Sequence, residues 1–298
     1  MKQSSKMSNT SQNERKRKRR SICERCKRPT PQACICAALP TTSPLTLSKS
    51  RVLVLQHPQE AKRKNRSLPL VEMCFSSDTS DSSVGQDPRV SDVSSLEDDF
   101  MFHTVVGRRF GPQTNKNIMR ILQDPTERTL LIYPSEDAIC LEDALEQVKR
   151  NQIKSRTIMK ESSNDPARIT LVFLDATWKY AKEMENACTT HNVWPSNLIR
   201  VKLSPANTNG TTHDFQPRRF DIRTPPSPNH LSTAECIARV LAIVEDDVSI
   251  FDTLMKPLDL MVQQWHSFSK SKAEGKDEFS VNASIVQKEA RMTRKETT

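Results

Sequence analysis

Four cysteines near the N-terminus have the spacing of a metal site. They follow the pattern Cys-x2-Cys-x7-Cys-x-Cys and are Cys23, Cys26, Cys34 and Cys36. A structural zinc ion is held by a closed tetrahedral set of thiolates of this kind. Few apolar residues lie between the cysteines, so a bound metal would supply much of the folding free energy of the segment. The pattern favours zinc over redox-active thiols or unrelated cysteines.

A second group of chemically capable residues follows a hydrophobic run. Residues 169–174 are apolar, β-branched or aromatic, which is typical of a strand buried on both faces. Asp175, Thr177 and Trp178 come directly after it, where the apolar period changes to that of a helix. Ligands of open parallel sheets bind at such strand ends. A purely structural interpretation is also open: Thr177 caps the helix, Trp178 lies in the core and Asp175 favours the helix dipole.

Two further predicted strands end in residues of the same kind. Residues 51–56 lead into His57, and residues 129–133 lead into Pro134 and Ser135. We expect the three strand ends to converge on one ligand cleft. Ser135 is also expected to cap a helix that follows it directly.

The glycine content narrows the ligand class. The chain has five glycines, and none lies in a Gly-rich turn between a strand and a helix. This argues against a P-loop and against a dinucleotide-binding fold. No Gly-x-Ser-x-Gly motif indicates a hydrolase. By elimination, the cleft is expected to take a nucleoside-type cofactor without phosphates, of which S-adenosylmethionine is one.

Strands alternate with helices along the chain, which predicts an α/β fold with a mainly parallel sheet and flanking helices. The Ser-x-x-Glu spacing of Ser232 and Glu235 is that of a capping box. The remaining predicted elements are strands at 102–106 and 198–203 and helices at 62–66, 114–123, 231–248 and 250–268.

Composition divides the 298 residues into parts. Residues 1–22 are predicted to be a disordered basic tail, and residues 23–48 a cysteine-rich motif with its linker. The main domain is expected at 49–268, interrupted at 76–99 by an acidic disordered insertion with eight serines and seven acidic residues against one arginine. Residues 269–298 are expected to be a disordered tail.

The basic charge is concentrated at the N-terminus. Residues 1–30 contain eleven lysines and arginines against Glu14 and Glu24, so they carry the whole net charge of +9. The run 15–20 is typical of a nuclear-localisation signal or a phosphate-binding arm, although a solvated tail explains it equally well. With no apolar run long enough for a signal peptide or a membrane span, we expect a protein of the nucleus, the cytoplasm or both.

Taken together over residues 23–268, these motifs resemble the DTW-domain family, whose signature is Asp-x-Thr-Trp. The resemblance also covers the cysteine cluster. Cys236 stands where alanine is common in the family. The other matching residues are His57, Pro58, Glu60, Arg63, Asn65, Tyr133, Pro134, Ser135, Arg223, Leu231, Ser232, Thr233 and Glu235.

The resemblance implies a SPOUT-like fold, in which the chain can be knotted, and a tRNA-uridine aminocarboxypropyltransferase. Such an enzyme transfers the 3-amino-3-carboxypropyl group of S-adenosylmethionine to N3 of a uridine and releases methylthioadenosine. Transfer RNA is then the expected partner, with no DNA or membrane partner. Two alternatives stay open: a SPOUT-like tRNA methyltransferase that yields S-adenosylhomocysteine, and a non-catalytic zinc RNA-binding protein.

The resemblance also implies roles for individual residues. Asp175 would take the N3 proton or orient the base, and Thr177 would hold the turn and bond the substrate or cofactor. Trp178 would stack on a base or form a wall of the pocket. The residues expected to hold S-adenosylmethionine are Tyr133, Pro134, Ser135, Leu231, Ser232, Thr233 and Glu235. Those expected to position the RNA or the aminocarboxypropyl carboxylate are His57, Glu60, Arg63, Asn65 and Arg223.

Overall fold

The computed structural model of the chain describes eight stretches, which are 21–41, 43–75, 100–111, 114–123, 128–159, 168–203, 219–222 and 230–268. The predicted acidic insertion at 76–99 and the predicted tail at 269–298 lie outside these residues. So do residues 1–20 of the predicted basic tail, including the basic run.

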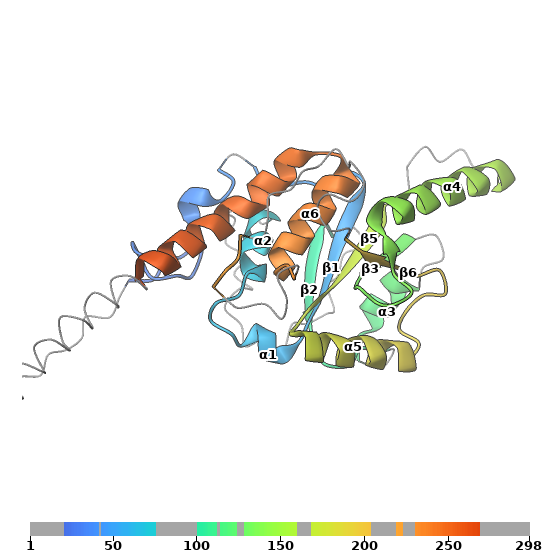
Figure 1. The fold of residues 1–298 in the computed structure, drawn as a ribbon, viewed down its shortest axis with the longest axis horizontal. Coiled ribbons are helices and arrows are strands. Elements are labelled where there is room, and N and C mark those ends of the chain that lie inside the picture. Colours follow the sequence, from blue (N-terminus) through green and yellow to red (C-terminus); the bar gives the residue numbers. More distant parts are fainter. Residues whose placement is uncertain are drawn as a thin grey trace, which may run out of the picture.

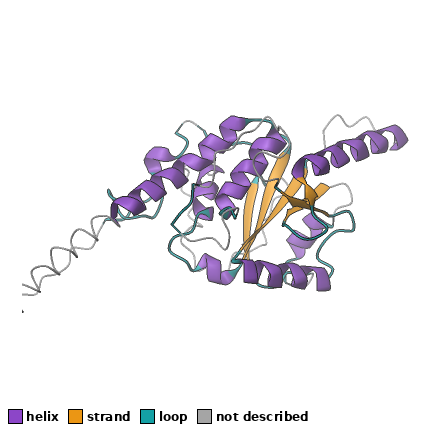
Figure 2. Cartoon of the chain, in the orientation of Figure 1, coloured by secondary structure: helices purple, strands orange, loops and turns teal. Residues whose placement is uncertain are grey.

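One six-stranded sheet forms the centre of the fold (Figure 2). Its strand order is β2-β1-β5-β3-β6-β4 and every neighbouring pair is parallel. The predicted α/β class with a parallel sheet is therefore confirmed. The strands are β1 (Ser50–Gln56), β2 (Phe102–Val106), β3 (Arg128–Ile132), β4 (Ile139–Cys140), β5 (Ile169–Asp175) and β6 (Ile199–Lys202).

Helices cover both faces of the sheet. One face packs against α2 (Leu68–Phe75), the first turns of α4 (Leu141–Met159), α6 (Thr233–Glu245) and a helix at 248–268. The other face packs against α3 (Lys116–Leu122) and α5 (Trp178–Thr190). The central strands are buried from both sides, which explains their continuous apolar runs. No helix in the described stretches is long and apolar enough to cross a bilayer.

Two local predictions are wrong. The helix expected at 62–66 is instead the single turn α1 (Pro58–Ala61), and the basic residues follow it. A Lys-Arg-Lys-Asn-Arg run has no apolar face to bury, so nothing extends that turn. Ser135 caps no helix either, because β4 pairs with β6 before α4 begins at Leu141.

The cysteine motif packs directly on the main domain. Ile35, Leu39 and Leu47 are buried in the same hydrophobic core as α6 and the helix at 248–268. The Gln264 side chain donates a hydrogen bond of 2.9 Å to the Cys34 carbonyl. Figure 1 accordingly shows the N-terminal segment, in blue, beside the orange-red helix. The motif and the core thus stabilise each other.

Candidate active site at the carboxyl edge of the sheet

The predicted strand ends do converge. Gln56 of β1 pairs in register with Asp175 of β5, and the His57 backbone N–H donates 2.9 Å to the Asp175 carbonyl. On the other side of β5, Ile132 of β3 pairs with Phe173. The three strands β1, β3 and β5 therefore end at the same edge of the sheet, which we call the carboxyl edge.

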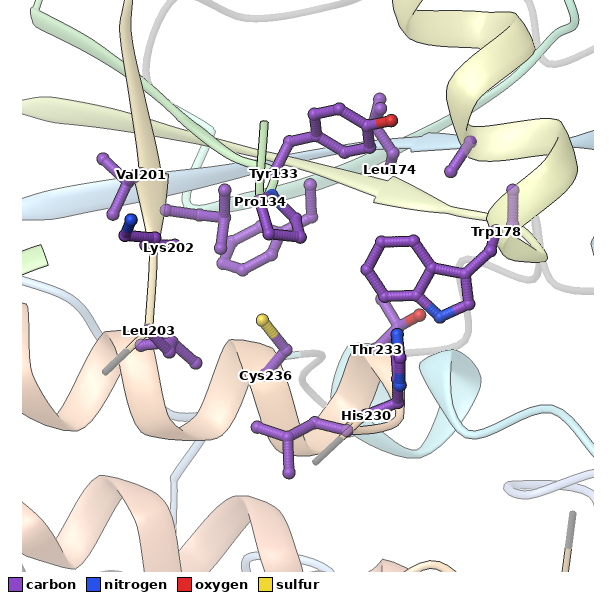
Figure 3. A pocket seen from close by; sticks show the side chains of 15 residues that line it. Tyr133, Pro134, Leu174, Trp178, Val201, Lys202, Leu203, His230, Thr233 and Cys236 are labelled. Carbon is purple, nitrogen blue, oxygen red and sulfur yellow. The ribbon is translucent and has the colours of Figure 1, made fainter. Parts of the chain in front are cut away.

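A cavity of about 310 Å³ opens at this edge, between the ends of β3, β5 and β6 and the start of α6 (Figure 3). Its size is at the lower end of the range for small-molecule sites, and its lining is mostly apolar. The lining residues are Ile132, Tyr133, Pro134, Phe173, Leu174, Ala176, Trp178, Ala181, Val201, Lys202, Leu203, His230, Leu231, Thr233 and Cys236.

Five of the predicted site residues line this cavity: Tyr133, Pro134, Trp178, Leu231 and Thr233. They come from three separate parts of the chain. Trp178 is 40% exposed, so it is not a core residue. Its indole meets the His230 ring edge-on at 4.5 Å between centroids, at the mouth of the cavity (Figure 3).

Asp175 lies beside the cavity and is 5% exposed. Its Oδ1 accepts a hydrogen bond from the Thr233 hydroxyl and its Oδ2 accepts one from the Gln56 amide, each of 2.6 Å. The carboxylate thereby joins the end of β1, the end of β5 and the first turn of α6. A buried charge needs such partners, because an unpaired carboxylate costs several kcal/mol away from water. The geometry is that of a clamp on the α6 N-terminus.

Ser232 and Glu235 hold the start of α6, which borders the cavity. The Ser232 hydroxyl accepts from the Glu235 backbone N–H, and the Glu235 carboxylate accepts from the Ser232 N–H, which confirms the predicted capping box. Glu235 is 1% exposed and also accepts from the N–H groups of Arg219 and Phe220. It therefore fixes both α6 and the segment 219–222, and neither capping residue lines the cavity.

Two predicted hydroxyls lie near the cavity but not in its lining. Thr177 is the N-cap of α5, yet its side chain makes no capping hydrogen bond. The structural interpretation, in which the Thr177 hydroxyl caps α5, is therefore wrong. The Ser135 hydroxyl is buried and has no hydrogen-bond partner among the described residues, although its position close to Asp137 lowers the pKa of that carboxyl.

His57 and Glu60 have structural contacts. The His57 Nδ1 accepts from the Gln59 N–H, which caps α1, and its ring stacks on Tyr180 at 4.1 Å and 5°. Burial lowers the pKa of His57, so the ring is neutral at physiological pH. Glu60 is buried and pairs with Arg63 at 3.2 Å.

The other predicted RNA contacts have different surroundings. The Arg63 side chain contacts Glu60 and is 42% exposed, and Asn65 is half-buried. Arg223 lies outside the described residues.

The four predicted metal ligands come together. The sulfurs of Cys23, Cys26, Cys34 and Cys36 all lie within 4.8 Å of one another. Two of the separations are 3.5 Å, for Cys23 and Cys36, and 3.8 Å, for Cys26 and Cys34. Metal–sulfur bonds of about 2.3 Å in a tetrahedron place neighbouring sulfurs roughly 3.8 Å apart. The cluster thus fits one tetrahedral metal ion.

The sequence interpretation missed several residues of this edge. Gln56 carried a signal, since it is the polar residue that ends the apolar run 52–55. His230 and Cys236 carried none, because their place in the cavity depends on how α6 packs against the sheet. Lys202 reaches the lining from β6.

The DTW domain profile matches residues 20–266. The chain belongs to the DTW-domain family. It is 30% identical to tRNA-uridine aminocarboxypropyltransferase 2 of Drosophila melanogaster over 242 residues, which is 80% of this chain and 73% of that protein. The protein of the same name from Mus musculus is 27% identical over 244 residues, with 82% and 63% covered.

A plant relative belongs to the same group. tRNA-uridine aminocarboxypropyltransferase A of Arabidopsis thaliana is 25% identical over 235 residues, with 77% of this chain and 74% of that protein covered. No solved structure matches the chain significantly. The family predicted from the motifs is confirmed, and the signature of this DTW domain is divided between two environments. Asp175 lies in a buried clamp, whereas Trp178 lies at the cavity mouth.

Proposed function

We propose that this DTW domain is a tRNA-uridine aminocarboxypropyltransferase. It would transfer the 3-amino-3-carboxypropyl group of S-adenosylmethionine to N3 of a tRNA uridine, as the names of its relatives imply for those proteins. One observation carries the proposal: residues from three separate motifs of the family line a single cavity with an exposed tryptophan at its mouth.

The cavity suits the donor molecule. Its apolar walls, including Pro134, Leu203 and Leu231, can cover an adenine ring and a methylthio group. The Tyr133 and Thr233 side chains add polar atoms at the lining. No phosphate cradle is needed for this nucleoside, which agrees with the scarcity of glycine in the chain.

The reaction requires that the two reacting atoms be aligned and that one proton be removed. A bond forms between uridine N3 and the γ-carbon of the donor, the carbon–sulfur bond breaks, and the sulfonium becomes a neutral thioether. The N3 proton is released to solvent, so the positive charge of the sulfonium leaves as H⁺. A sulfonium has three electrophilic carbons, so the site must present the γ-carbon in line with N3. Trp178 is placed to hold the uridine by stacking.

We assign Asp175 to positioning rather than to proton removal. Both of its oxygens accept hydrogen bonds from side chains of the protein, and it is outside the cavity lining. It holds Thr233 and the α6 N-terminus against the cavity. Thr177 lies in the turn between β5 and α5, and its hydroxyl, which makes no capping hydrogen bond, is available to a ligand at that turn.

Three further proposals accompany the activity. The metal held by the four cysteines would be zinc, and the basic run 15–20 would direct nuclear import. The strand order, in which β5 lies between β1 and β3, supports a SPOUT-like arrangement of the sheet. Zinc removal by a chelator is expected to lower the melting temperature, because Ile35 and Leu39 belong to the main core.

The direct test is mass spectrometry after incubation of the protein with unmodified tRNA and S-adenosylmethionine. Methylthioadenosine together with an aminocarboxypropyl-uridine in the digested tRNA is the expected result. S-adenosylhomocysteine with a methylated base would mean a methyltransferase. Binding of tRNA without either product would mean a non-catalytic RNA-binding protein.

A further inference from the structure

Cations collect where three neighbouring segments leave the carboxyl edge. Segment 57–67 follows β1, segment 107–111 follows β2, and segment 176–183 starts α5. Figure 1 shows α1 and α5 along the same border of the molecule, below the ends of these strands. The seven exposed cations on them are Lys62, Arg63, Lys64, Arg108, Arg109, Lys179 and Lys182.

Two side-chain contacts join the three segments into one surface. The His57 ring stacks on Tyr180, which places the start of α1 against α5. Arg108 pairs with Glu183 at 2.8 Å, which places the turn after β2 against the same side of α5, about one helical turn beyond Tyr180. We call this continuous area the cationic edge surface.

The charge of this surface is strongly one-sided. The three segments contain eight lysines and arginines against two acidic residues, Glu60 and Glu183. Each of these two carboxylates is already paired with an arginine of the surface. Residues after 30 have no net charge overall, so an excess of this size marks a distinct area rather than a generally basic protein.

Helix geometry connects the surface to the cavity. Ala181, Met184 and Cys188 form the buried side of α5. At about 100° per residue, Lys179 and Lys182 fall on the opposite, solvent-facing side. Trp178 and Lys182 are one helical turn apart and so share a stripe. The tryptophan therefore marks the point where the cationic edge surface meets the cavity mouth.

We infer that the phosphate backbone of the RNA substrate crosses the cationic edge surface and that its target uridine leaves the backbone at Trp178 to enter the cavity. This inference rests on the proposed function for the identity of the polyanion. Lysine and arginine side chains at this density neutralise phosphates and release counterions, which gives salt-dependent binding without base specificity. His57 and Glu60 then serve as supports that hold the cationic segment in place, and the exposed cations make the contacts.

The test uses a triple variant of the full chain, Lys64→Gln, Arg109→Gln and Lys179→Gln. These three residues are exposed and form no ion pair within the described stretches, so we expect their replacement to leave the fold intact. The control is Lys149→Gln, Arg150→Gln and Lys256→Gln, which removes the same charge from exposed positions on α4 and on the helix at 248–268. Of these three, Lys149 has an ion pair, with the exposed Glu146, and an exposed pair of this kind contributes little to stability.

Binding of fluorescent unmodified tRNA is measured by anisotropy at several salt concentrations. The triple edge variant is expected to bind about tenfold or more weakly at low salt, and the slope of log affinity against log salt to fall by about two. The control variant is expected to stay within about twofold of the wild type. S-adenosylmethionine binding should be unchanged in both. In the transfer reaction, the edge variant should raise KM for tRNA and keep kcat at saturation.

The outcomes separate the surface from the activity. If the edge variant binds tRNA like the wild type, or if the control loses as much affinity, the cationic edge surface is not the RNA-binding site, even if transfer occurs. If only the edge variant loses affinity for tRNA and the wild type yields no aminocarboxypropyl-uridine, the RNA-binding surface is supported and the proposed transfer is rejected.

Discussion

The two ends of helix α6 each meet a carboxylate that ties the helix to the sheet, yet only one end belongs to a site. At the opposite edge of the sheet, where β1 begins and which we call the amino edge, Glu245 accepts hydrogen bonds from Ser48, Lys49 and Ser50 at 2.6–3.2 Å. At the carboxyl edge, Asp175 accepts from Gln56 and Thr233. Both side chains are buried and both connect α6 with the β1 region.

The difference lies in what surrounds each carboxylate. Glu245 and its partners close the amino edge around the start of β1. Asp175 has the cavity on one side, with Trp178 and His230 at its mouth. A buried acidic residue therefore does not identify a site by itself. The neighbouring open volume does, because it leaves room for a ligand next to a rigid support.

The largest effect is expected from removing the Asp175 clamp. In Asp175→Ala the Thr233 hydroxyl and the Gln56 amide lose their acceptor, and a shift of α6 by about 1 Å would cost roughly 100-fold in kcat. In Asp175→Asn the Gln56 amide can turn to face the new side chain, so we expect activity within about tenfold of wild type. Single-turnover transfer rates measure both. An Asn variant as inactive as the Ala variant, with the same melting temperature as wild type, would make Asp175 the base.

Changing Glu245 should lower stability while leaving chemistry intact. Glu245→Gln places an NH2 group among donors and removes charge-assisted bonds, so we expect the free energy of unfolding to fall by about 2–3 kcal/mol. Urea titration measures it. The transfer rate below the unfolding transition should equal that of the wild type. A rate loss comparable to that of Asp175→Ala would erase the contrast between the two edges.

The same residue predicts how stability depends on pH. Burial alone raises the pKa of Glu245, but hydrogen bonds from Ser50, Ser48 and Lys49 outweigh it and hold the pKa below the usual 4.5. The stabilisation is thus present above about pH 4.5 and is lost as pH falls through the lower, folded-state pKa. Urea titrations between pH 3 and 6 should show a smaller acid-side slope in Glu245→Gln. Equal slopes in the two proteins would contradict the assignment.

The smallest effect is expected from Cys236→Ala in the cavity. Burial raises the pKa of the Cys236 thiol to about 12, so the group is neutral and acts only by its volume. One methyl-sized change in an apolar pocket alters affinity by about tenfold or less. The KM for S-adenosylmethionine should stay in that range and the pH–rate profile should not move. A profile that shifts in the alanine variant would show that the thiol titrates during catalysis.

The sequence anticipated features that depend on short stretches. The continuous apolar runs of β1 and β5 identify buried parallel strands, and Ser232 with Glu235 identifies the start of α6. The clamp could not be found in this way, since Thr233 reaches Asp175 across 58 residues of chain and Gln56 across 119. The placement of His230 likewise follows from the packing of α6. Strand ends can be predicted locally, but their partners depend on the strand order.

The central claim is that the cavity at the carboxyl edge is where the aminocarboxypropyl group is transferred. It is tested most directly with S-adenosylmethionine labelled by ¹⁴C in its carboxyl group and by ³H in its methyl group, using the wild type and a Cys236→Trp variant whose indole fills the cavity. The wild type should place ¹⁴C in tRNA and leave ³H in the released nucleoside, and the folded Trp variant should do neither. Tritium in tRNA, or a Trp variant that melts cooperatively and transfers ¹⁴C at the wild-type rate, would contradict the claim.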